Sequence, residues 1–273
     1  MDTIIFDLLK AVILGVVEGL TEFLPISSTG HLILINQFAT FDKEFTLLFD
    51  IVIQLGAIFA VVFFFWKRLW PFTKDKNRNR EVLNIWYKTI IGVLPAIFFG
   101  ALFASKIEEK LFNPWTVAIA LLVGGLVILF VERKRPKGCP DPKIISISNL
   151  SYKTAFFIGL VQCLSMIPGT SRSAATIIGA ILFGASRVVA TEFSFFLAIP
   201  TMFAASAYSL LKYRAILNLS QIFVLSVGFI VSFMVALAVI KFLINYVQKN
   251  NFKIFGYYRI ILGVIIIIYF LIK

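Results

Sequence analysis

The chain is poor in several residues on which soluble enzymes and metal proteins often rely. It has one histidine, two cysteines and only 14 acidic residues against 26 basic ones in a length of 273 residues. Cys139 lies in a basic segment and Cys163 in an apolar one, so they provide neither a disulfide framework nor the spacing of metal ligands. The Gly-rich motif of P-loop nucleotide-binding proteins is also missing. These shortages argue against a disulfide scaffold, a cysteine-metal site and a P-loop enzyme.

Apolar residues are abundant instead. Hydrophobic residues make up 60% of the chain, phenylalanine occurs 30 times, and the mean hydropathy is +0.94. This composition is typical of an integral membrane protein. Because a bilayer-spanning helix needs roughly 20 apolar residues, the sequence predicts six crossings. They cover 45 to 66, 89 to 105, 115 to 131, 192 to 211, 221 to 246 and 255 to 272.

Two further apolar regions, 8 to 40 and 154 to 188, are interrupted by Pro25 and by Pro168-Gly169. Hydroxyl residues follow each break. We interpret each region as a re-entrant, broken helix pair, which enters the membrane and turns back. Non-helical backbone at membrane depth is tolerated only where protein or a water-filled cavity satisfies its polar groups. The two breaks are therefore the places where a functional site is expected.

Basic residues gather between the apolar runs and indicate orientation. The segments 67 to 80 and 132 to 143 hold the densest Lys and Arg, which predicts that both face the cytoplasm. The formal net charge of +12 thus orients the protein and does not indicate nucleic acid. A charge-balanced loop at 106 to 110 would face outward together with both termini, and Lys212 and Arg214 fit this orientation poorly. The first residues lack the basic start and cleavage site of a signal peptide and are expected to belong to the mature protein.

An internal repeat relates the two broken regions. GVVEGLTEFLPISS, which begins at Gly15, aligns with GLVQCLSMIPGTS, which begins at Gly159. With one deletion, Ser28 aligns with Ser171. The shared Gly, Pro and Ser positions favour a true repeat over chance similarity between apolar segments.

The repeat predicts an all-α polytopic fold with inverted topology. Each half would hold one broken pair and three crossings, and an odd number of crossings inverts the second half relative to the first. We expect a single membrane domain over 1 to 273, with halves of about 1 to 131 and 154 to 273. A basic cytoplasmic connector, 132 to 153, would join them. The two broken tips would then meet near the middle of the membrane.

Glu18 and Glu22 are four residues apart and so lie on one face of the first broken helix. Carboxylates in a membrane segment are costly and usually functional. Two of them beside substrate phosphate oxygens suit a hard divalent cation, Mg²⁺ or Ca²⁺. The alternative is that both residues lie at the solvent-facing end of an interfacial helix.

Ser27, Ser28 and Thr29 lie at the start of the next helix, where hydroxyls and free N–H groups favour an anion. Serine before an apolar run is also an ordinary helix cap. His31, one turn further on, favours the functional interpretation because histidine is a common general acid or base near neutral pH. A structural hydrogen-bonding role for this histidine is the alternative.

The second tip contains PGTSRSAAT at 168 to 176. Arg172 stands between Ser171 and Ser173, and Thr176 follows one turn later. Arginine is the fork-shaped, permanently charged partner of phosphate, so the segment predicts a phosphate clamp; an Arg snorkelling to the interface is the alternative. Together the two tips suit phosphoryl transfer from a lipid-borne phosphate.

At this level of detail the sequence resembles the undecaprenyl-diphosphate phosphatase family. EGLTEFLPISSTGH and PGTSRSAAT match its two signature motifs, and VIQLGAI, LFNP and EFSFFLAIP extend the likeness over the whole chain. Ala174 departs from the family, which commonly has glycine there. The resemblance implies a bacterial plasma-membrane enzyme, with its active site facing outward, that converts undecaprenyl diphosphate to undecaprenyl phosphate. It also implies a divalent cation, a role in recycling the cell-wall lipid carrier and resistance to bacitracin.

The mechanism that we expect assigns roles to both tips. Ser28 attacks the terminal phosphorus while Glu22 and His31 manage protons and Glu18 helps to hold the cation. Arg172 and the helix-start groups bind the diphosphate and stabilise the transition state. His31 as nucleophile is an open alternative. The groups expected to bind the diphosphate besides Arg172 are Ser27, Thr29, Ser171, Ser173 and Thr176.

Two rival functions are compatible with parts of this pattern. A transporter or flippase of a lipid phosphate or small anion uses the same inverted-repeat architecture, although it would not need this set of acid–base groups. A lipid phosphatase related to acid phosphatases would need a second catalytic histidine, which the chain lacks. A homodimer is left open. Asp50, Glu192 and Arg259 could pair with each other or shape the cavity, and a structural role is expected for them.

Overall fold

The computed structural model describes residues 2–134, 142–212 and 217–273. Within these residues, the structure has six helices long and apolar enough to cross a membrane, which confirms the predicted number. Residues 135–141 of the predicted connector, with Cys139, and Arg214 lie outside the described part. The six helices are α3 (Lys43–Phe64), α5 (Lys76–Leu111), α6 (Pro114–Arg133), α9 (Arg187–Lys212), α10 (Leu219–Lys249) and α11 (Lys253–Ile272).

The two broken regions form helix pairs with the predicted interruptions. In the first, α1 (Asp2–Thr21) is followed by a turn through Pro25 and by α2 (Ser28–Ile35). In the second, α7 (Tyr152–Gln162) continues into the 3₁₀ turn η2 (Cys163–Met166), and α8 (Arg172–Leu182) starts after Pro168 and Gly169. The remaining elements are α4 (Trp66–Leu69) and the 3₁₀ turn η1 (Ile147–Asn149).

Helix α5 is much longer than the predicted crossing of 89 to 105. It begins at the basic segment, where the Asp75 side chain caps the helix by accepting hydrogen bonds from the N–H groups of Asn77 and Arg78. It also includes residues 106 to 110, so the prediction of a loop there is wrong. Lys, Arg and Glu are good helix formers, which explains why charged residues extend the helix at both ends.

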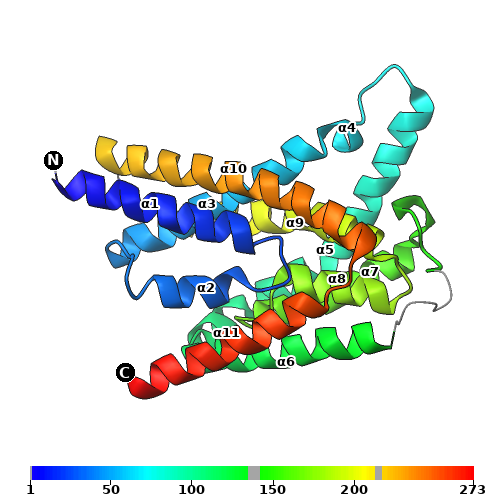
Figure 1. Cartoon of the computed structure of the whole chain (residues 1–273). Coiled ribbons are helices and arrows are strands. Elements are labelled where there is room, and N and C mark those ends of the chain that lie inside the picture. The colour runs from blue at the N-terminus through cyan, green and yellow to red at the C-terminus, as the bar shows by residue number, and fades with distance from the viewer. Residues whose placement is uncertain (1, 135–141, 213–216) are drawn as a thin grey trace.

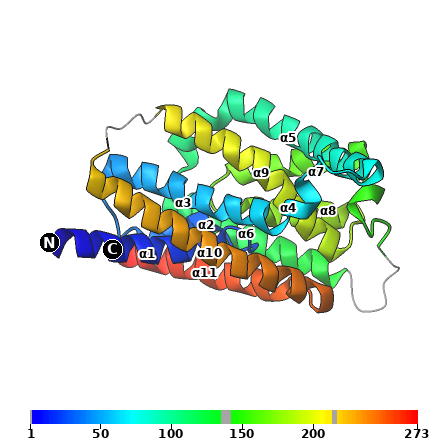
Figure 2. The same ribbon diagram turned by 90° about the horizontal axis from the view of Figure 1, so that it is seen from above.

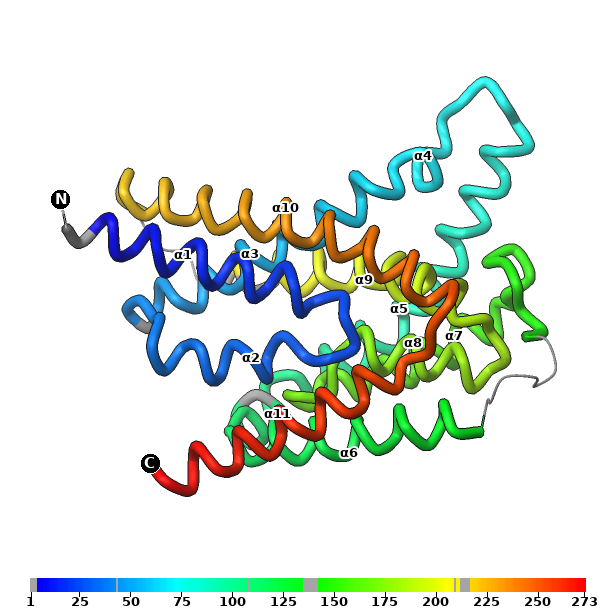
Figure 3. The backbone as a smooth tube through the Cα atoms, in the orientation of Figure 1, coloured from blue at the N-terminus to red at the C-terminus, as the bar shows by residue number. Residues whose placement is uncertain are grey.

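The helices run roughly along one long direction of the molecule (Figures 1 and 2). Both chain termini lie at one end, and α4, the end of α6 and the α10–α11 turn lie at the other. Helix α7 starts at this second end, where the Tyr152 hydroxyl donates to Asn84 of α5 at 2.8 Å. The tube in Figure 3 shows α1 approaching the middle from the end with the termini, after which α2 turns back. The two broken pairs thus approach the middle from opposite ends.

Each broken pair packs on a long helix through glycine. A Cβ atom on Gly15 or Gly19 of α1 would come within 2.8 Å or 2.7 Å of a carbonyl oxygen of α10. A Cβ on Gly159 of α7 would lie even closer to the carbonyl oxygen of Gly92 in α5. Small residues let helix backbones approach closely. The glycines therefore let each broken pair pack closely against its long helix.

Candidate active site

The two tips have the same unusual backbone. Ser27 and Ser171 are the N-caps of α2 and α8, and their φ angles are 75° and 69°. Among the described residues, they are the only non-glycine residues with positive φ. The Ser27 hydroxyl accepts from the N–H of Gly30 at 3.3 Å, and the Ser171 hydroxyl from that of Ala174 at 3.2 Å. Such strained positions cluster at functional sites.

The cap geometry corrects the alignment of the two tips. Ser171 follows Ser27 by 144 residues, as Gly159 follows Gly15, so the two stretches match without a deletion. Ser28 therefore corresponds to Arg172 and not to Ser171. The proline match had suggested the deletion, but the structurally equivalent residues are the capping serines.

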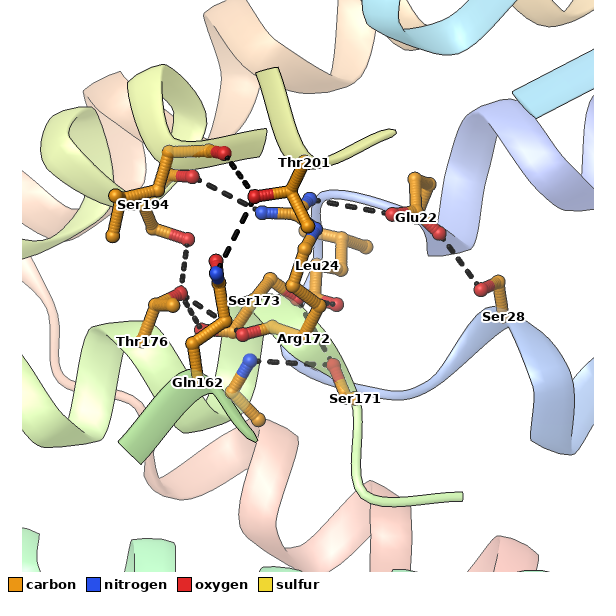
Figure 4. Close-up of polar contacts among 12 residues, drawn as sticks. Glu22, Leu24, Ser28, Gln162, Ser171, Arg172, Ser173, Thr176, Ser194 and Thr201 are labelled. Carbon is orange, nitrogen blue, oxygen red and sulfur yellow. Dashed lines mark hydrogen bonds and ion pairs between the residues drawn. The ribbon is translucent and has the colours of Figure 1, made fainter. Parts of the chain in front are cut away.

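Glu22 joins the two tips (Figure 4). Its Oε2 accepts a hydrogen bond of 2.8 Å from the Ser28 hydroxyl, and its Oε1 pairs with Nη2 of Arg172 at 3.2 Å. Both charged side chains are only 10% exposed. Arg172 also donates to the carbonyl oxygen of Ser194 at 3.0 Å, while its Nε has no partner. The Ser28 hydroxyl, the Glu22 carboxylate and the Arg172 guanidinium thus form one line of hydrogen-bonded groups. The Nε–H of Arg172 is still free to donate to a further acceptor.

The other hydroxyls of the second tip bond with groups of the protein, and one of them, on Ser173, reaches the first tip. The Ser173 hydroxyl is fully buried and donates to the Leu24 carbonyl oxygen at 2.9 Å. It is also 3.0 Å from the Ser171 hydroxyl. The fully buried Thr176 hydroxyl bonds with Ser194 at 2.6 Å and with backbone carbonyls. The hydroxyls of Ser173 and Thr176 are therefore occupied by protein partners. Ser171 of the second tip and Thr29 of the first tip are only partly buried.

Glu18 is fully buried, and neither carboxylate oxygen has a hydrogen-bond partner. Glu22, Asp50 and Arg172 are the charged groups that act on it. A buried carboxylate without a donor is costly, and a divalent cation shared with Glu22 would relieve that cost. No group of three or more His, Cys, Asp or Glu is arranged for a metal in the described chain. Protein ligands alone would thus be two carboxylates, a number that suits a cation completed by substrate phosphate.

His31 lies on the same tip but not on the Ser28–Glu22 line. Its Nδ1 bonds with the Ser27 carbonyl oxygen and its Nε2 with the Tyr258 hydroxyl of α11, both at 2.7 Å. The structure therefore brings Glu18, Glu22, Ser28 and Arg172 together as predicted. It places His31 beside them with a partner that the sequence did not reveal.

Arg259 of α11, for which a structural role is expected, lies at the site itself. Its guanidinium is fully buried and donates to the carbonyl oxygens of Gly169 at 3.0 Å, Ala120 at 3.1 Å and Pro25 at 3.5 Å. It thus touches the backbone of both tips. A Cβ on Gly124 would overlap the guanidinium, so this glycine makes room for it. A lone Arg in the last apolar run was the available signal.

Two further carboxylates form structural ion pairs, as expected for Glu192. Its carboxylate pairs with Arg68 at 2.5 Å. Glu132, 2% exposed, pairs with Arg187 at 2.5 Å and accepts from the N–H of Phe252 at 3.0 Å. These contacts join helix ends at the end of the molecule that holds α4 and the α10–α11 turn, which we call the basic end. They do not involve the two tips.

Comparisons with known proteins point to one family. The family model described as bacitracin resistance protein BacA matches residues 11–265. A protein named undecaprenyl-diphosphatase from Lachnoclostridium phytofermentans is 50% identical over 269 residues, covering 97% of each chain. Undecaprenyl-diphosphatase 1 of Clostridioides difficile is 47% identical over 270 residues, again with 97% of each chain covered. An undecaprenyl-diphosphatase of Streptococcus thermophilus is 48% identical over 276 residues, 98% of this chain and 95% of the relative.

Proposed function

Because the chain belongs to the bacitracin resistance protein BacA family, we propose that it hydrolyses undecaprenyl diphosphate to undecaprenyl phosphate and inorganic phosphate. The relatives that cover nearly all of the chain carry the name of this activity. The reaction regenerates the lipid carrier of bacterial cell-wall synthesis, and it gives bacitracin resistance by removing the diphosphate form. The single observation that best supports it is the Ser28–Glu22–Arg172 line between the two tips.

In the proposed mechanism, Ser28 is the nucleophile. Its hydroxyl already donates to Glu22, so the carboxylate is placed to take the proton as the oxygen attacks the terminal phosphorus. The bond from that phosphorus to the bridging oxygen breaks, and undecaprenyl phosphate leaves. Water then attacks the phosphorus of phospho-Ser28 and gives a proton to His31, while the Ser28 oxygen takes its proton back from Glu22 and phosphate is released. Arg172 stabilises the charge that develops on the phosphoryl oxygens. Ser27, Thr29 and Ser171 contribute hydroxyls or cap N–H groups, while Ser173 and Thr176 hold Arg172 and the tip in place.

A divalent cation, Mg²⁺ or Ca²⁺, belongs to the proposal. Glu18 and Glu22 would hold it, because Glu18 is buried without a partner in the structure. When bound, the cation supplies positive charge that draws the phosphate oxygens toward the carboxylate side of the site. The carboxylates themselves fix its place beside Ser28.

We also propose that the two broken pairs are re-entrant and that the halves form an inverted repeat. The matching cap serines and the opposite approach of α1 and α7 support this. So does the packing of each pair on a long helix of the other half, α1 on α10 and α7 on α5. The basic end then faces the cytoplasm, and the site opens to the outer side of a bacterial plasma membrane. A homodimer is compatible with this arrangement.

A phosphate-release assay tests the proposed activity. Purified protein in lipid vesicles is incubated with a polyprenyl diphosphate, with and without a chelator. We expect phosphate release that stops when the cation is removed and returns with Mg²⁺ or Ca²⁺. Movement of the lipid across the vesicle membrane without phosphate release would instead favour a flippase.

Trapping of a phospho-enzyme tests the nucleophile. After a short reaction, rapid acid or base quenching and peptide mapping should locate the phosphoryl group on Ser28. A phosphoryl group on His31 would reassign the nucleophile. Turnover with no modified residue at any time would overturn covalent catalysis.

A further inference from the structure

The hydroxyl of Tyr258 on α11 lies 2.7 Å from Nε2 of His31, although the two residues are 227 positions apart. Their rings are stacked, with centroids 5.6 Å apart and an angle of 11° between the planes. A hydrogen bond and a ring contact therefore act on the same imidazole. Two contacts from one residue restrict both the position and the rotation of the His31 ring.

The partners of His31 define which nitrogen is free to react. The Ser27 carbonyl oxygen, 2.7 Å from Nδ1, can only accept a hydrogen bond. The neutral imidazole therefore carries its proton on Nδ1, a tautomer assigned from this network. Its Nε2 has the lone pair and accepts from the Tyr258 hydroxyl. Nε2 is thus the nitrogen that can take a proton, and Tyr258 is the group bonded to it.

Both rings line a groove of about 370 Å³ between α1, α2, α10 and α11. Most of the other lining is apolar, including Leu20, Leu24 and Phe242. Tyr258 is 43% exposed, so its hydroxyl can move without unpacking the core. A polar pair at the edge of an apolar groove suits a lipid with a charged head.

We propose that Tyr258 is a positioning residue for His31. Its hydroxyl holds the imidazole with Nε2 toward the groove until another donor takes the place of the phenol on Nε2: a water molecule, or a protonated phosphate oxygen of the substrate. The part of this inference that concerns the reaction rests on the proposed function. The part that concerns the His31 contact does not.

The contact is tested by chemical modification of His31, the single histidine in the chain. The full-length protein in detergent reacts with diethyl pyrocarbonate, and mass spectrometry follows the modification of His31. Tyr258→Phe keeps the stacked ring and removes only the hydroxyl. We expect His31 to react about fivefold or more faster in this variant, because Nε2 has lost its partner. Tyr257→Phe, a change at the exposed neighbour, should leave the rate unchanged.

The role in the reaction is tested by kinetics of the same variants. Tyr258→Phe should lower kcat/KM for a polyprenyl diphosphate by about tenfold, the factor for one lost hydrogen bond, with an unchanged melting temperature. Equal His31 modification rates in wild type and Tyr258→Phe would overturn the contact. Faster modification with wild-type kinetics would overturn the positioning role. If the wild type releases no phosphate, the proposed function fails, and the modification rates still decide the contact.

Discussion

The two tips share a backbone and differ in chemistry. Both begin a helix at a serine with positive φ, but the residue after that serine is Ser28 in the first tip and Arg172 in the second. The first tip also has a buried Glu18 where the second has Gln162, which is 1% exposed and bonds with Thr201 at 3.3 Å. One tip is therefore the acidic side of the site and the other the cationic side.

Two tips with the same backbone can thus form a site that is asymmetric in charge. The backbone of each tip supplies a strained cap and free N–H groups, which any anion could use. Divergence at the equivalent positions then separates the roles. Glu22 on the acidic tip and Arg172 on the cationic tip meet at 3.2 Å. Variants that make the two tips more alike should therefore damage the reaction more than variants that weaken both caps.

Among changes that keep the proposed nucleophile Ser28, loss of the cationic tip should have the largest effect. Arg172→Ala removes the guanidinium that we propose to stabilise the transition state, and it leaves Glu22 buried without its pair. We expect kcat to fall by about 10³-fold, measured as phosphate release. Arg172→Lys, which keeps the charge without the fork, should recover part of the loss. Near wild-type kcat in Arg172→Ala would mean that the cationic tip does not take part in the chemistry.

Glu18→Gln gives the acidic tip the residue that the second tip already has. It removes one of two carboxylates proposed for the cation, so activity should fall by about 100-fold, and a higher cation concentration should be needed for half-maximal rate. Titration of the rate with Mg²⁺ measures this. The matched control is Gln162→Ala on the other tip, which should not change the cation requirement. An unchanged cation requirement in Glu18→Gln would remove Glu18 from the cation site.

Arg259→Met breaks the link between the tips without touching either one. Three buried carbonyl oxygens lose their charged donor, and each hydrogen bond to a charged group is worth about 1.5–3 kcal/mol. We expect a lower melting temperature and about a tenfold loss of kcat, with Arg259→Lys in between. Lys253→Met at the start of the same helix should change neither quantity. A stable Arg259→Met protein with full activity would show that the tips keep their places unaided.

The smallest effects should come from the caps themselves. Ser27→Ala and Ser171→Ala each remove one helix-cap hydrogen bond, which is worth about 1 kcal/mol, so both should lower the melting temperature slightly and by similar amounts. Ser28→Ala should leave the melting temperature nearly unchanged and abolish phosphate release. Thermal unfolding followed by circular dichroism, alongside the assay, separates the two kinds of serine. Unequal effects of the two cap variants would argue against equivalent tips.

Much of the fold was predictable because its signals are local. Apolar runs of helix-spanning length predict the six crossings, and Pro25 and Pro168 predict the breaks. The charged groups Glu18, Glu22 and Arg172 stand out because apolar surroundings make them expensive. The ends of α5 were missed because charged residues mark the end of an apolar run but not the end of a helix.

The rest depends on contacts that no local pattern encodes. The alignment placed Ser28 opposite Ser171 because it matched prolines, whereas the equivalence is set by backbone angles at Ser27 and Ser171. Tyr258 and Arg259 are consecutive on α11, yet one reaches His31 and the other reaches both tips. Which residue of a distant helix meets the tips follows from packing, which a single sequence does not contain.

The length of α5 has a practical consequence. Its 36 residues extend over about 54 Å at 1.5 Å per residue, well beyond the roughly 30 Å of a bilayer core. Figure 1 shows the α4–α5 hairpin projecting from the helix bundle. Thr73 and Asn79 bond with each other at 2.7 Å and brace the hairpin. A protein of only 30.7 kDa thus has a projecting hairpin that is stabilised by its own hydrogen bonds. A fusion partner or antibody fragment can be attached to this hairpin, away from the tips, for image alignment in electron microscopy.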